Sequence, residues 1–371
     1  MAQSHTIGFV TAALLAAGAS GAVGLTGAII GPGFGFGALG SAAIGSSPIG
    51  ATASPLSVLQ RAKPWLAAVP GGPLALRGKV VLVNFWTYSC INSLRALPHL
   101  RSWNERYASK GLAVVGVHAP EFQFERDAAR VQLASKQLGV AYPSLQDNNY
   151  SVWQSFANEG WPGFYFIDAD GRMRGYRVGE GKYAEVEQFI RILLAEAGQD
   201  LSNIPLAPAT GAGIEAEADW NNLRSPESYL GYGKAERFAS PGGVDRDLSR
   251  DYAAAPGLPL NHWDIAGQWT IGTEFATLDS SHGAIRFRFH ARDAHLVLGG
   301  AGDGKPIRYR VTIDGVAPGV NRGVDVDADG WGEVKEDRLY QLVRQAGEIA
   351  DRTISIEFSR PGARAYVFTF G

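Results

Sequence analysis

The pattern of apolar and polar residues changes along the chain, and the middle part has the pattern of an α/β domain. Between residues 64 and 198, short apolar runs stand at 80–83, 114–117 and 164–167. Continuous apolar runs of this length are typical of strands that are covered on both faces. The segments between and after them carry apolar residues at helical spacing. The pattern therefore predicts a mixed sheet flanked by helices.

Two helices and a hairpin complete this prediction. Apolar residues recur every three or four positions over 94–107 and again over 183–194, which is the spacing of one helix face. The turn sequence Asp-Ala-Asp-Gly at 168–171 joins the third apolar run to residues 173–178. Such a turn between two strand-like segments predicts an antiparallel hairpin.

The last part of the chain, from residue 226 to 371, has a period of two. Apolar and polar residues alternate in short segments with Gly-rich turns between them, which predicts an antiparallel β-sandwich or jelly roll. The alternating segments are 285–289, 309–313, 354–358 and 366–370. Residues 199–225, rich in Pro, Ala and acidic residues, are expected to be a linker, so that the α/β domain covers 61–198.

The first 60 residues contain no Lys, Arg, Asp or Glu. The stretch from Ile7 to Ile30 is long enough to cross a bilayer as a helix. A second interpretation is an export signal with its apolar core at 7–17 and a small-residue cleavage site at 51–53. A disordered Ala/Gly tail is the third. No basic residue precedes the apolar run, so the pattern indicates no membrane orientation. We expect an exported protein that is periplasmic, extracellular or membrane-anchored.

The composition of the chain limits the classes of partner and cofactor that we expect. The chain has 371 residues, a net charge of -2, 46% apolar and 19% charged residues, which fits a folded protein of two domains. Without a basic run, nucleic acid is not an expected partner. Seven histidines and one cysteine lack the spacing of zinc ligands. We expect no metal and no other cofactor.

One acidic segment keeps calcium binding open. Asp325, Asp327, Asp329 and Glu336 have the ligand spacing of an EF-hand loop. The surrounding sequence indicates strands and turns rather than a helix pair, and acidic turns between strands produce the same spacing without metal. The sequence therefore does not decide between the two.

The single cysteine, Cys90, stands between the first apolar run and the first predicted helix. At a helix N-terminus, free backbone N–H groups and the helix dipole favour a thiolate. Three residues later the chain has Ser93, so no internal disulfide can form. The Ser93 hydroxyl is able to donate a hydrogen bond to the sulfur. Whether Ser93 is natural or an introduced substitution stays open.

Four blocks of sequence carry a family resemblance. Residues 76–86, 87–98, 117–122 and 161–168 resemble the TlpA- and DipZ-type thioredoxin-like proteins, which are extracytoplasmic thiol-disulfide oxidoreductases. The resemblance covers about residues 64 to 198. It implies attack of Cys90 on a disulfide of a protein or small molecule. Because serine replaces the second cysteine of the family, an outside thiol has to resolve the mixed disulfide.

The resemblance also assigns roles to other residues. Pro162 is expected to follow a cis peptide bond and to present backbone groups beside the sulfur. Trp86, Tyr88 and Trp161 are expected to border the thiol and contact the substrate. Asn84 stands where many thioredoxins carry a buried aspartate.

The end of the chain resembles the domain that follows thioredoxin in DipZ-type proteins, through residues 226–232 and 338–343. That domain looks like a carbohydrate-binding module, so a carbohydrate is a second candidate partner. Exposed aromatic faces would be needed for sugar binding. The available aromatic residues are Trp220, Trp263, Trp269, Trp331, Tyr229 and Tyr232, and the sequence singles out no sugar site among them.

Two other functions stay open. A one-cysteine peroxide reductase also uses a lone thiolate, and Thr87 stands three residues before Cys90 as in peroxiredoxins. However, Val83 occupies the position where that family has a proline. The other alternative is a catalytically degenerate thioredoxin fold that only binds a partner. Glu121 is a candidate proton acceptor near the thiol, and His99 and His118 lie near it in sequence or in a matching block.

Overall fold

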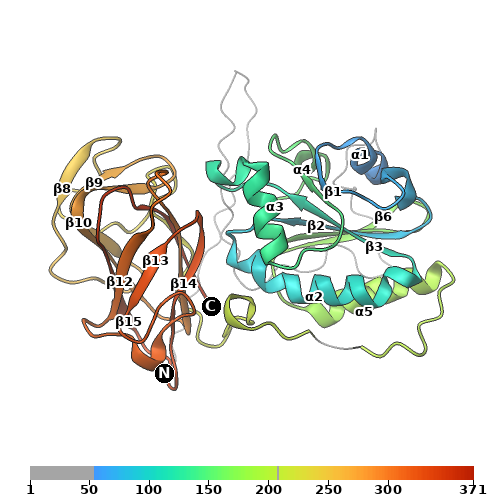
Figure 1. Ribbon diagram of the computed structural model, residues 1–371. Helices are drawn as coiled ribbons and strands as arrows, with labels where there is room; N and C mark the ends of the chain where they lie inside the picture. The colour runs from blue at the N-terminus through green and yellow to red at the C-terminus, as the bar shows by residue number, and fades with distance from the viewer. Residues whose placement is uncertain (1–53, 207–208) are drawn as a thin grey trace, which may run out of the picture.

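The computed structural model describes residues 54–206 and 209–371, which form an α/β domain and a β domain side by side (Figure 1). The membrane span or export signal predicted within residues 1–53 lies outside the described residues. Among the helices of the described part, none has the length and apolar character needed to cross a membrane.

The α/β domain contains a six-stranded mixed sheet in the order β1-β4-β3-β2-β5-β6. Its central strand β2 pairs in parallel with β3 and antiparallel with β5. The three predicted strands and the hairpin are confirmed as β2, β3, β5 and β6. The strand bounds are β1 Trp65–Ala67, β2 Val80–Trp86, β3 Leu112–His118, β4 Ser144–Gln146, β5 Gly163–Ile167 and β6 Met173–Val178.

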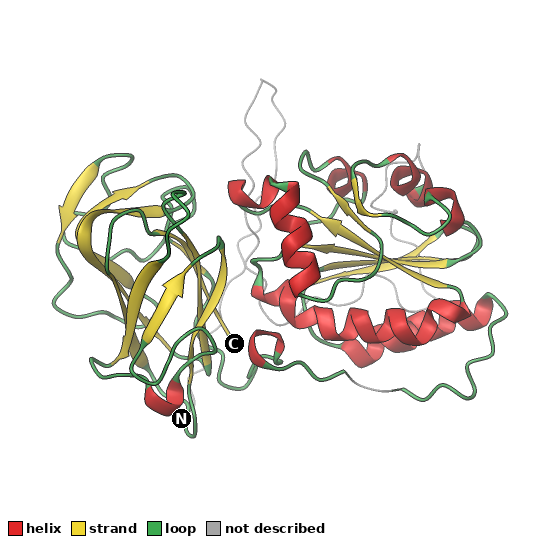
Figure 2. Ribbon diagram, viewed as in Figure 1, coloured by secondary structure: helices red, strands yellow, loops and turns green. Residues whose placement is uncertain are grey.

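Helices cover both faces of this sheet, with α2 and α5 on one face and α1 and α4 on the other (Figures 1 and 2). Consecutive residues of β2 explain this arrangement, because Leu82 packs in the α2 and α5 core while Val81 packs in the opposite core. The helix bounds are α1 Pro55–Arg61, α2 Ile91–Tyr107, α3 Ala128–Gln137, α4 Ser151–Ser155 and α5 Tyr183–Glu196. Short 3-10 turns cover Pro73–Leu76, Ala108–Lys110, Gln123–Arg126, Gly213–Glu215 and Gly319–Asn321.

The β domain is one curled sheet of ten strands, in which all paired strands are antiparallel. The all-β prediction is confirmed, with the four alternating segments inside β10, β12, β15 and β16. The sheet curls because the long strand β10 pairs with β9, β15 and β16, and it encloses an aromatic core. The bounds are β7 Ser228–Tyr229, β8 Ser249–Tyr252, β9 Trp263–Ile271, β10 Ala276–Phe289, β11 Asp293–Gly299, β12 Ile307–Ile313, β13 Trp331–Val334, β14 Arg338–Arg344, β15 Arg352–Phe358 and β16 Arg364–Phe370.

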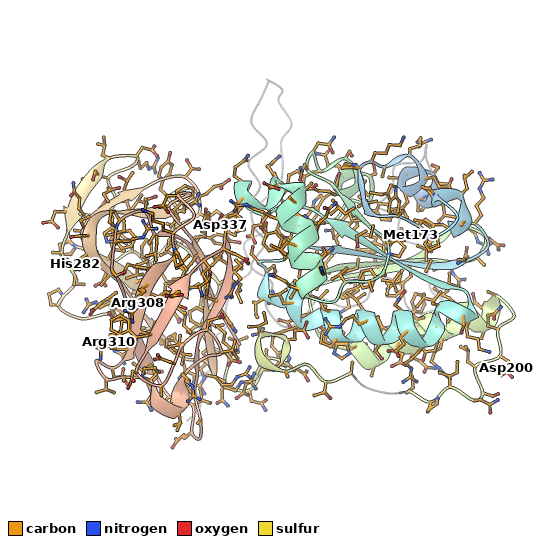
Figure 3. All side chains as sticks on the ribbon, in the orientation of Figure 1. Met173, Asp200, His282, Arg308, Arg310 and Asp337 are labelled. Carbon is orange, nitrogen blue, oxygen red and sulfur yellow. The ribbon has the colours of Figure 1, made fainter. Side chains whose placement is uncertain are left out.

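The two domains pack against each other near the start of α2. The ring of Tyr366 in β16 lies 5.0 Å from the rings of both Phe122 and Phe124. Asp337 lies on the side of the β domain that faces α3, where it pairs with Arg130 (Figure 3). These contacts place the β domain beside the segment that follows β3.

The segment predicted as a linker is held against the α/β domain at more than one place, since Arg191 of α5 also donates to the carbonyls of Leu201 and Ile204. Its short turn Gly213–Glu215 packs on α2, where both guanidinium nitrogens of Arg101 donate to the Glu215 carboxylate at 2.8 and 2.6 Å. Arg344 of the β domain donates to the Gly213 carbonyl at 3.1 Å. The linker therefore contacts both domains.

Candidate active site

Cys90 is the N-cap residue of α2, the position that the sequence predicts for it. Strand β2 ends at Trp86, a four-residue turn follows, and the Cys90 carbonyl accepts the first helical hydrogen bond from the Leu94 N–H at 3.0 Å. The backbone of Cys90 is extended, as expected for a residue that precedes a helix. Its side chain is a free thiol, and the residue is 8% exposed.

The strand register brings Pro162 to the same edge of the sheet. Phe85 of β2 pairs with Gly163 of β5, so Pro162 lies beside the end of β2 from which the Cys90 turn departs. The Trp161–Pro162 peptide bond is cis, which confirms the prediction. The ring of Trp161 packs on Trp153 with centroids 4.7 Å apart and remains partly exposed.

The thiol of Cys90 is less ready to ionise than the helix position alone suggests. Burial, followed by the negative charges of Glu121 and Glu227, raises its pKa above the ordinary value of a thiol. Hydrogen bonds from the backbone and hydroxyl of Ser93 oppose this rise. The sequence reasoning considered the helix end and Ser93, but it left out the burial and the second carboxylate.

Trp86 and Tyr88 are both predicted to contact the substrate, but their surroundings in the structure differ from each other. Trp86 is fully buried in the core and packs edge-on against His118, so it is not available to a substrate, and the prediction for this residue is wrong. It is buried because it is the last residue of a strand covered on both faces. Tyr88 is 5% exposed and lines a cavity of about 490 Å³ between the domains, together with Leu94 and Arg130.

A buried carboxylate that the sequence reasoning missed holds the turn before Cys90. Glu125 has no exposed surface, and its Oε1 accepts hydrogen bonds from the Thr87 hydroxyl and from the Ser89 hydroxyl and N–H. Its Oε2 accepts from the N–H groups of Glu121 and Phe122. Burial raises the pKa of Glu125 to about 7. Its position three residues from a predicted site block gave no signal for this role.

The two candidate histidines, His118 and His99, contact other side chains of the α/β domain. His118 at the end of β3 is buried, its Nε2 lies 3.4 Å from the Thr87 hydroxyl, and burial lowers its pKa to about 3. His99 stacks on Tyr183 with ring centroids 3.7 Å apart, and burial lowers its pKa to about 4. Both rings are therefore neutral at physiological pH, and among the described residues no hydrogen bond joins either ring to the sulfur.

The charge of Glu121, the candidate proton acceptor, raises the pKa of the Cys90 thiol, and the β domain brings a second carboxylate to Glu121. The Tyr229 hydroxyl contacts the Glu121 carboxylate and lies 3.0 Å from Oε2 of Glu227. Lys234 places its amino group 3.9 Å from Glu121 and 4.2 Å above the centre of the Tyr229 ring. We call the group formed by Glu121, Tyr229 and Glu227 the carboxyl bridge.

The acidic segment that kept calcium binding open is used by the β domain itself. Asp325 pairs with Arg338 at 2.6 Å and accepts the Gln341 N–H, while Asp327 accepts the N–H groups of Asp329 and Trp331. Across the described residues, no cluster of His, Cys, Asp and Glu has the arrangement of a metal site.

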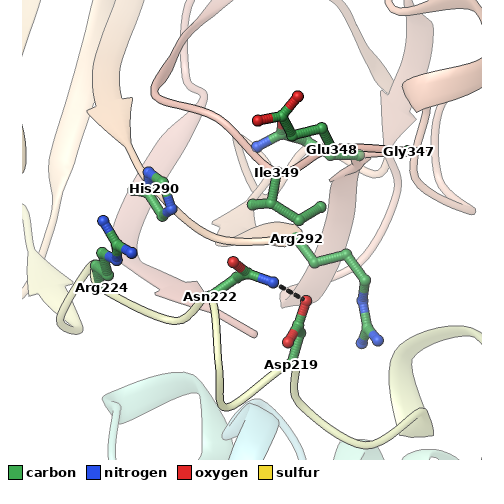
Figure 4. A pocket seen from close by; sticks show the side chains of 9 residues that line it. Asp219, Asn222, Arg224, His290, Arg292, Gly347, Glu348 and Ile349 are labelled. Atoms are coloured by element: carbon green, nitrogen blue, oxygen red, sulfur yellow. Dashed lines mark hydrogen bonds between the residues drawn. The ribbon is translucent and has the colours of Figure 1, made fainter.

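A second cavity lies between the β domain and the end of the linker segment (Figure 4). It has a volume of about 720 Å³ and polar walls, which include His290 and Arg224. At its rim the Asn222 amide donates to Asp219 at 2.8 Å, and His290 Nδ1 lies 2.7 Å from Asp351.

Comparison with known proteins agrees with this two-domain arrangement. A model of the AhpC/TSA family matches residues 74–176, and a model of a thioredoxin like C-terminal domain matches residues 225–371. Protein DipZ of Mycobacterium tuberculosis is 38% identical over 251 residues, which are 65% of this chain and 35% of DipZ. The chain is DipZ-like in sequence and thioredoxin-like in fold. It spans about a third of the length of the DipZ proteins that it matches.

Shorter proteins resemble only the α/β domain of this DipZ-like chain. Thiol-disulfide oxidoreductase YkuV of Bacillus subtilis is 25% identical over 142 residues, which are 38% of this chain and 95% of YkuV. A solved thioredoxin-like protein in the oxidized form is 26% identical, with 36% of this chain and 90% of that one covered and a TM-score of 0.33.

Proposed function

We propose that this protein carries out thiol-disulfide exchange through a mixed disulfide on Cys90. The observation that carries the proposal is the position of the only cysteine, at the start of α2 and at the sheet edge where Pro162 begins β5. The DipZ-like sequence supports the same chemistry. Ser93 follows three residues later, so the chain itself has no thiol that could resolve the adduct.

The proposed reaction has two exchange steps. The Cys90 thiolate attacks one sulfur of a disulfide, the S–S bond breaks, and the other sulfur leaves as a thiolate. An outside thiolate then attacks the mixed disulfide and releases Cys90. In this proposal Tyr88 and Trp161 contact the bound partner, because both lie near the turn and keep some exposed surface. The partner is a protein or small molecule that contains a disulfide.

The test is the formation of a stable adduct. Reduced protein is mixed with 2-hydroxyethyl disulfide, and the intact mass is measured before and after addition of glutathione. We expect one adduct on Cys90 that persists until glutathione is added, and none with Cys90→Ser. Complete absence of the adduct at pH 8 to 9, where more of the thiol is ionised, would contradict the proposal.

Peroxide reduction is the second candidate, since the AhpC/TSA family model covers residues 74–176. The Thr87 hydroxyl is fully buried and donates to Glu125, so it is already engaged within the turn. We therefore expect little peroxide turnover. Consumption of hydrogen peroxide in the presence of a thiol, without any disulfide adduct, would favour the peroxidase function instead.

Two further proposals concern location and the β domain. We place the protein outside the cytoplasm, on the basis of the uncharged first 60 residues. For carbohydrate binding, an exposed ring is available in Trp220, which lies in the linker segment just before the β domain and is 44% exposed. Trp263 and Trp269 are fully buried, and Arg308 stacks 4.5 Å from the ring of Trp331. A glycan-binding assay with Trp220→Ala tests this proposal.

A further inference from the structure

The cavity between the two domains, which Tyr88 lines, combines an apolar lining with charged side chains. Its volume of about 490 Å³ is that of a site for a small organic molecule. The described lining includes neither Cys90 nor a residue of the carboxyl bridge, so this cavity is distinct from the thiol site. The apolar part comes from α2, α3 and its end, the linker turn and β14, through Leu94, Leu133, Ala134, Leu138, Ile214 and Leu339.

The β domain borders the cavity with a glycine-rich loop that joins β11 to β12. Gly302 and Gly304 of this loop have φ angles of 81° and 73°, a backbone conformation that favours glycine. A Cβ atom added at either glycine would meet no other atom within 4 Å, so the space beside the loop is open. The loop ends at Lys305, which is exposed. In the described part of the chain, the lysines that form ion pairs are Lys182, Lys234 and Lys335, and Lys305 is not among them.

Positive charge is in excess where the two domains meet at this cavity. Asp337 accepts from Arg130 of α3 through one carboxylate oxygen and from Arg364 of β16, at 2.8 Å, through the other. Two guanidinium groups therefore share one carboxylate. The Arg130 side chain is 47% exposed and uses one nitrogen for Asp337, so further N–H groups of this side chain are open to a ligand. In Figure 3 the labelled Asp337 marks this side of the β domain, facing α3.

The remaining charges of the lining do not cancel this excess. Arg338 pairs with Asp325 at 2.6 Å, and Lys335 pairs with Glu333 at 2.9 Å. Glu336 also lines the cavity and offsets the charge of Lys305. The five cationic side chains of the lining thus stand against four carboxylates, when the ion-pair partners are included. One positive charge is left over.

The lining also holds a polar group that lacks a partner. The Tyr88 hydroxyl is buried, and among the described residues nothing forms a hydrogen bond with it. Buried hydroxyl groups are usually hydrogen-bonded. A phenol has one hydrogen to donate, and an anionic oxygen in the cavity is an acceptor for it.

We propose that this cavity binds a small organic anion that has an apolar body and a single carboxylate or sulfonate group. The apolar body packs against the leucines of α2 and α3, and the anionic group faces Arg130, Lys305 and the Tyr88 hydroxyl. Because the lining comes from both domains, the bound anion contacts both. Binding is noncovalent and does not depend on the proposed thiol chemistry of Cys90.

The test compares two fluorescent dyes that differ by one negative charge. The probe 8-anilinonaphthalene-1-sulfonate has an apolar body and one sulfonate, and N-phenyl-1-naphthylamine is the same molecule without the sulfonate. Each dye is titrated into the full chain, and fluorescence gives the dissociation constant and the stoichiometry. We expect one molecule of the sulfonate dye to bind, with a dissociation constant on the order of tens of micromolar. The neutral dye should bind more weakly.

Charge variants identify the anion site. Lys305→Gln and Arg130→Gln should each raise the dissociation constant of the sulfonate dye about two- to fivefold and leave that of the neutral dye unchanged. Lys79→Gln is the matched control, because Lys79 is exposed, precedes β2 and does not line the cavity. Equal affinities of the two dyes for the wild type, or an equal loss in Lys79→Gln, overturns the inference.

A filled cavity identifies the apolar part of the site. Ala134→Trp occupies the cavity and should weaken binding of both dyes at least roughly tenfold. Leu133→Glu is the second variant, at a position that is 48% exposed and tolerates a polar residue without unfolding. It should weaken the sulfonate dye more than the neutral one. Thermal unfolding checks that each variant is folded, and full affinity in both variants would show that the dye binds elsewhere and overturn the inference.

Cys90→Ser separates this inference from the proposed function. The variant removes the thiol, so it should form no disulfide adduct, and it should bind the sulfonate dye like the wild type. Dye binding without any disulfide adduct in the wild type would remove the exchange reaction and keep the anion site. An adduct without dye binding would do the reverse.

Discussion

Ser89 donates its hydroxyl hydrogen to the carboxylate of Glu125 across 2.6 Å, and this bond ties the turn before Cys90 to the segment after β3. Thr87 donates to the same carboxylate oxygen, while the N–H of Glu121 donates to the other oxygen. One buried carboxylate therefore fixes the turn that presents the thiol and the segment that carries Glu121. This arrangement makes Glu125 a positioning residue for both.

The first prediction is that Glu125→Gln destabilises the fold by about 1–3 kcal/mol. Both oxygens of the Glu125 carboxylate accept hydrogen bonds, whereas an amide has one acceptor oxygen and an NH₂ group in place of the other. The NH₂ group then faces hydrogen-bond donors, so at least one buried donor loses its acceptor. Urea unfolding at pH 6 measures the loss. Glu159→Gln is the control, because Glu159 is exposed and the substitution should change the free energy of unfolding by less than about 0.5 kcal/mol. Equal effects of the two substitutions would contradict the role of Glu125.

The second prediction concerns the pH dependence of that loss. Burial raises the pKa of Glu125 from 4.5 to about 7, so between these values the folded protein binds more protons at this site than the unfolded chain. The contribution of the group to stability is therefore complete below pH 4.5 and decreases as pH rises toward 7, on the order of 1 kcal/mol per pH unit. Glu125→Gln lacks this titration. The stability gap between the variant and the wild type should shrink from pH 5 to pH 7, and a gap that widens would refute the assignment.

The sequence predicts the parts of this site that depend on local patterns. The apolar run of β2, the helical spacing of α2 and the cysteine between them place Cys90 at the helix start, and the Trp161–Pro162 bond is cis as expected. Long-range contacts are not visible in such patterns. Glu227 and Tyr229 stand more than a hundred residues after Glu121, and only the packing of the β domain brings them to it.

Burial is the other property that the pattern leaves out. Trp86 is predicted to border the thiol and to contact the substrate. It is nevertheless a core residue, since both faces of β2 are covered. The same sheet geometry explains why β2 reads as a continuous apolar run. A side chain at the end of such a strand packs inward, and the following turn from Thr87 to Cys90 is buried as well.

The third prediction tests the interface between the domains. Tyr366 is 1% exposed, and its ring touches Phe122 and Phe124 of the α/β domain and Phe275 of its own. Tyr366→Ala should cost about 3–5 kcal/mol, and it should separate the unfolding of the two domains into two calorimetric transitions. Leu248→Ala on the surface of the β domain is the control, since Leu248 is 66% exposed. A single transition at an unchanged temperature would show that this aromatic contact does not couple the domains.

The last prediction restores a second thiol next to Cys90. Ser93 is 1% exposed and lies one helical turn after Cys90. Its hydrogen bonds to Cys90 lower the pKa of the Cys90 thiol. Residues three apart on a helix are neighbours, so Ser93→Cys places a resolving thiol beside the mixed disulfide. The adduct with 2-hydroxyethyl disulfide should then decay at least roughly 100-fold faster without added glutathione, because the attack becomes intramolecular. The intact mass should show an internal disulfide, because the oxidised variant is two hydrogens lighter than the reduced one.

Ser89→Cys provides the comparison, because the Ser89 side chain donates to Glu125. Equal adduct lifetimes in the two variants would mean that position 93 does not face the sulfur in the way the exchange reaction requires.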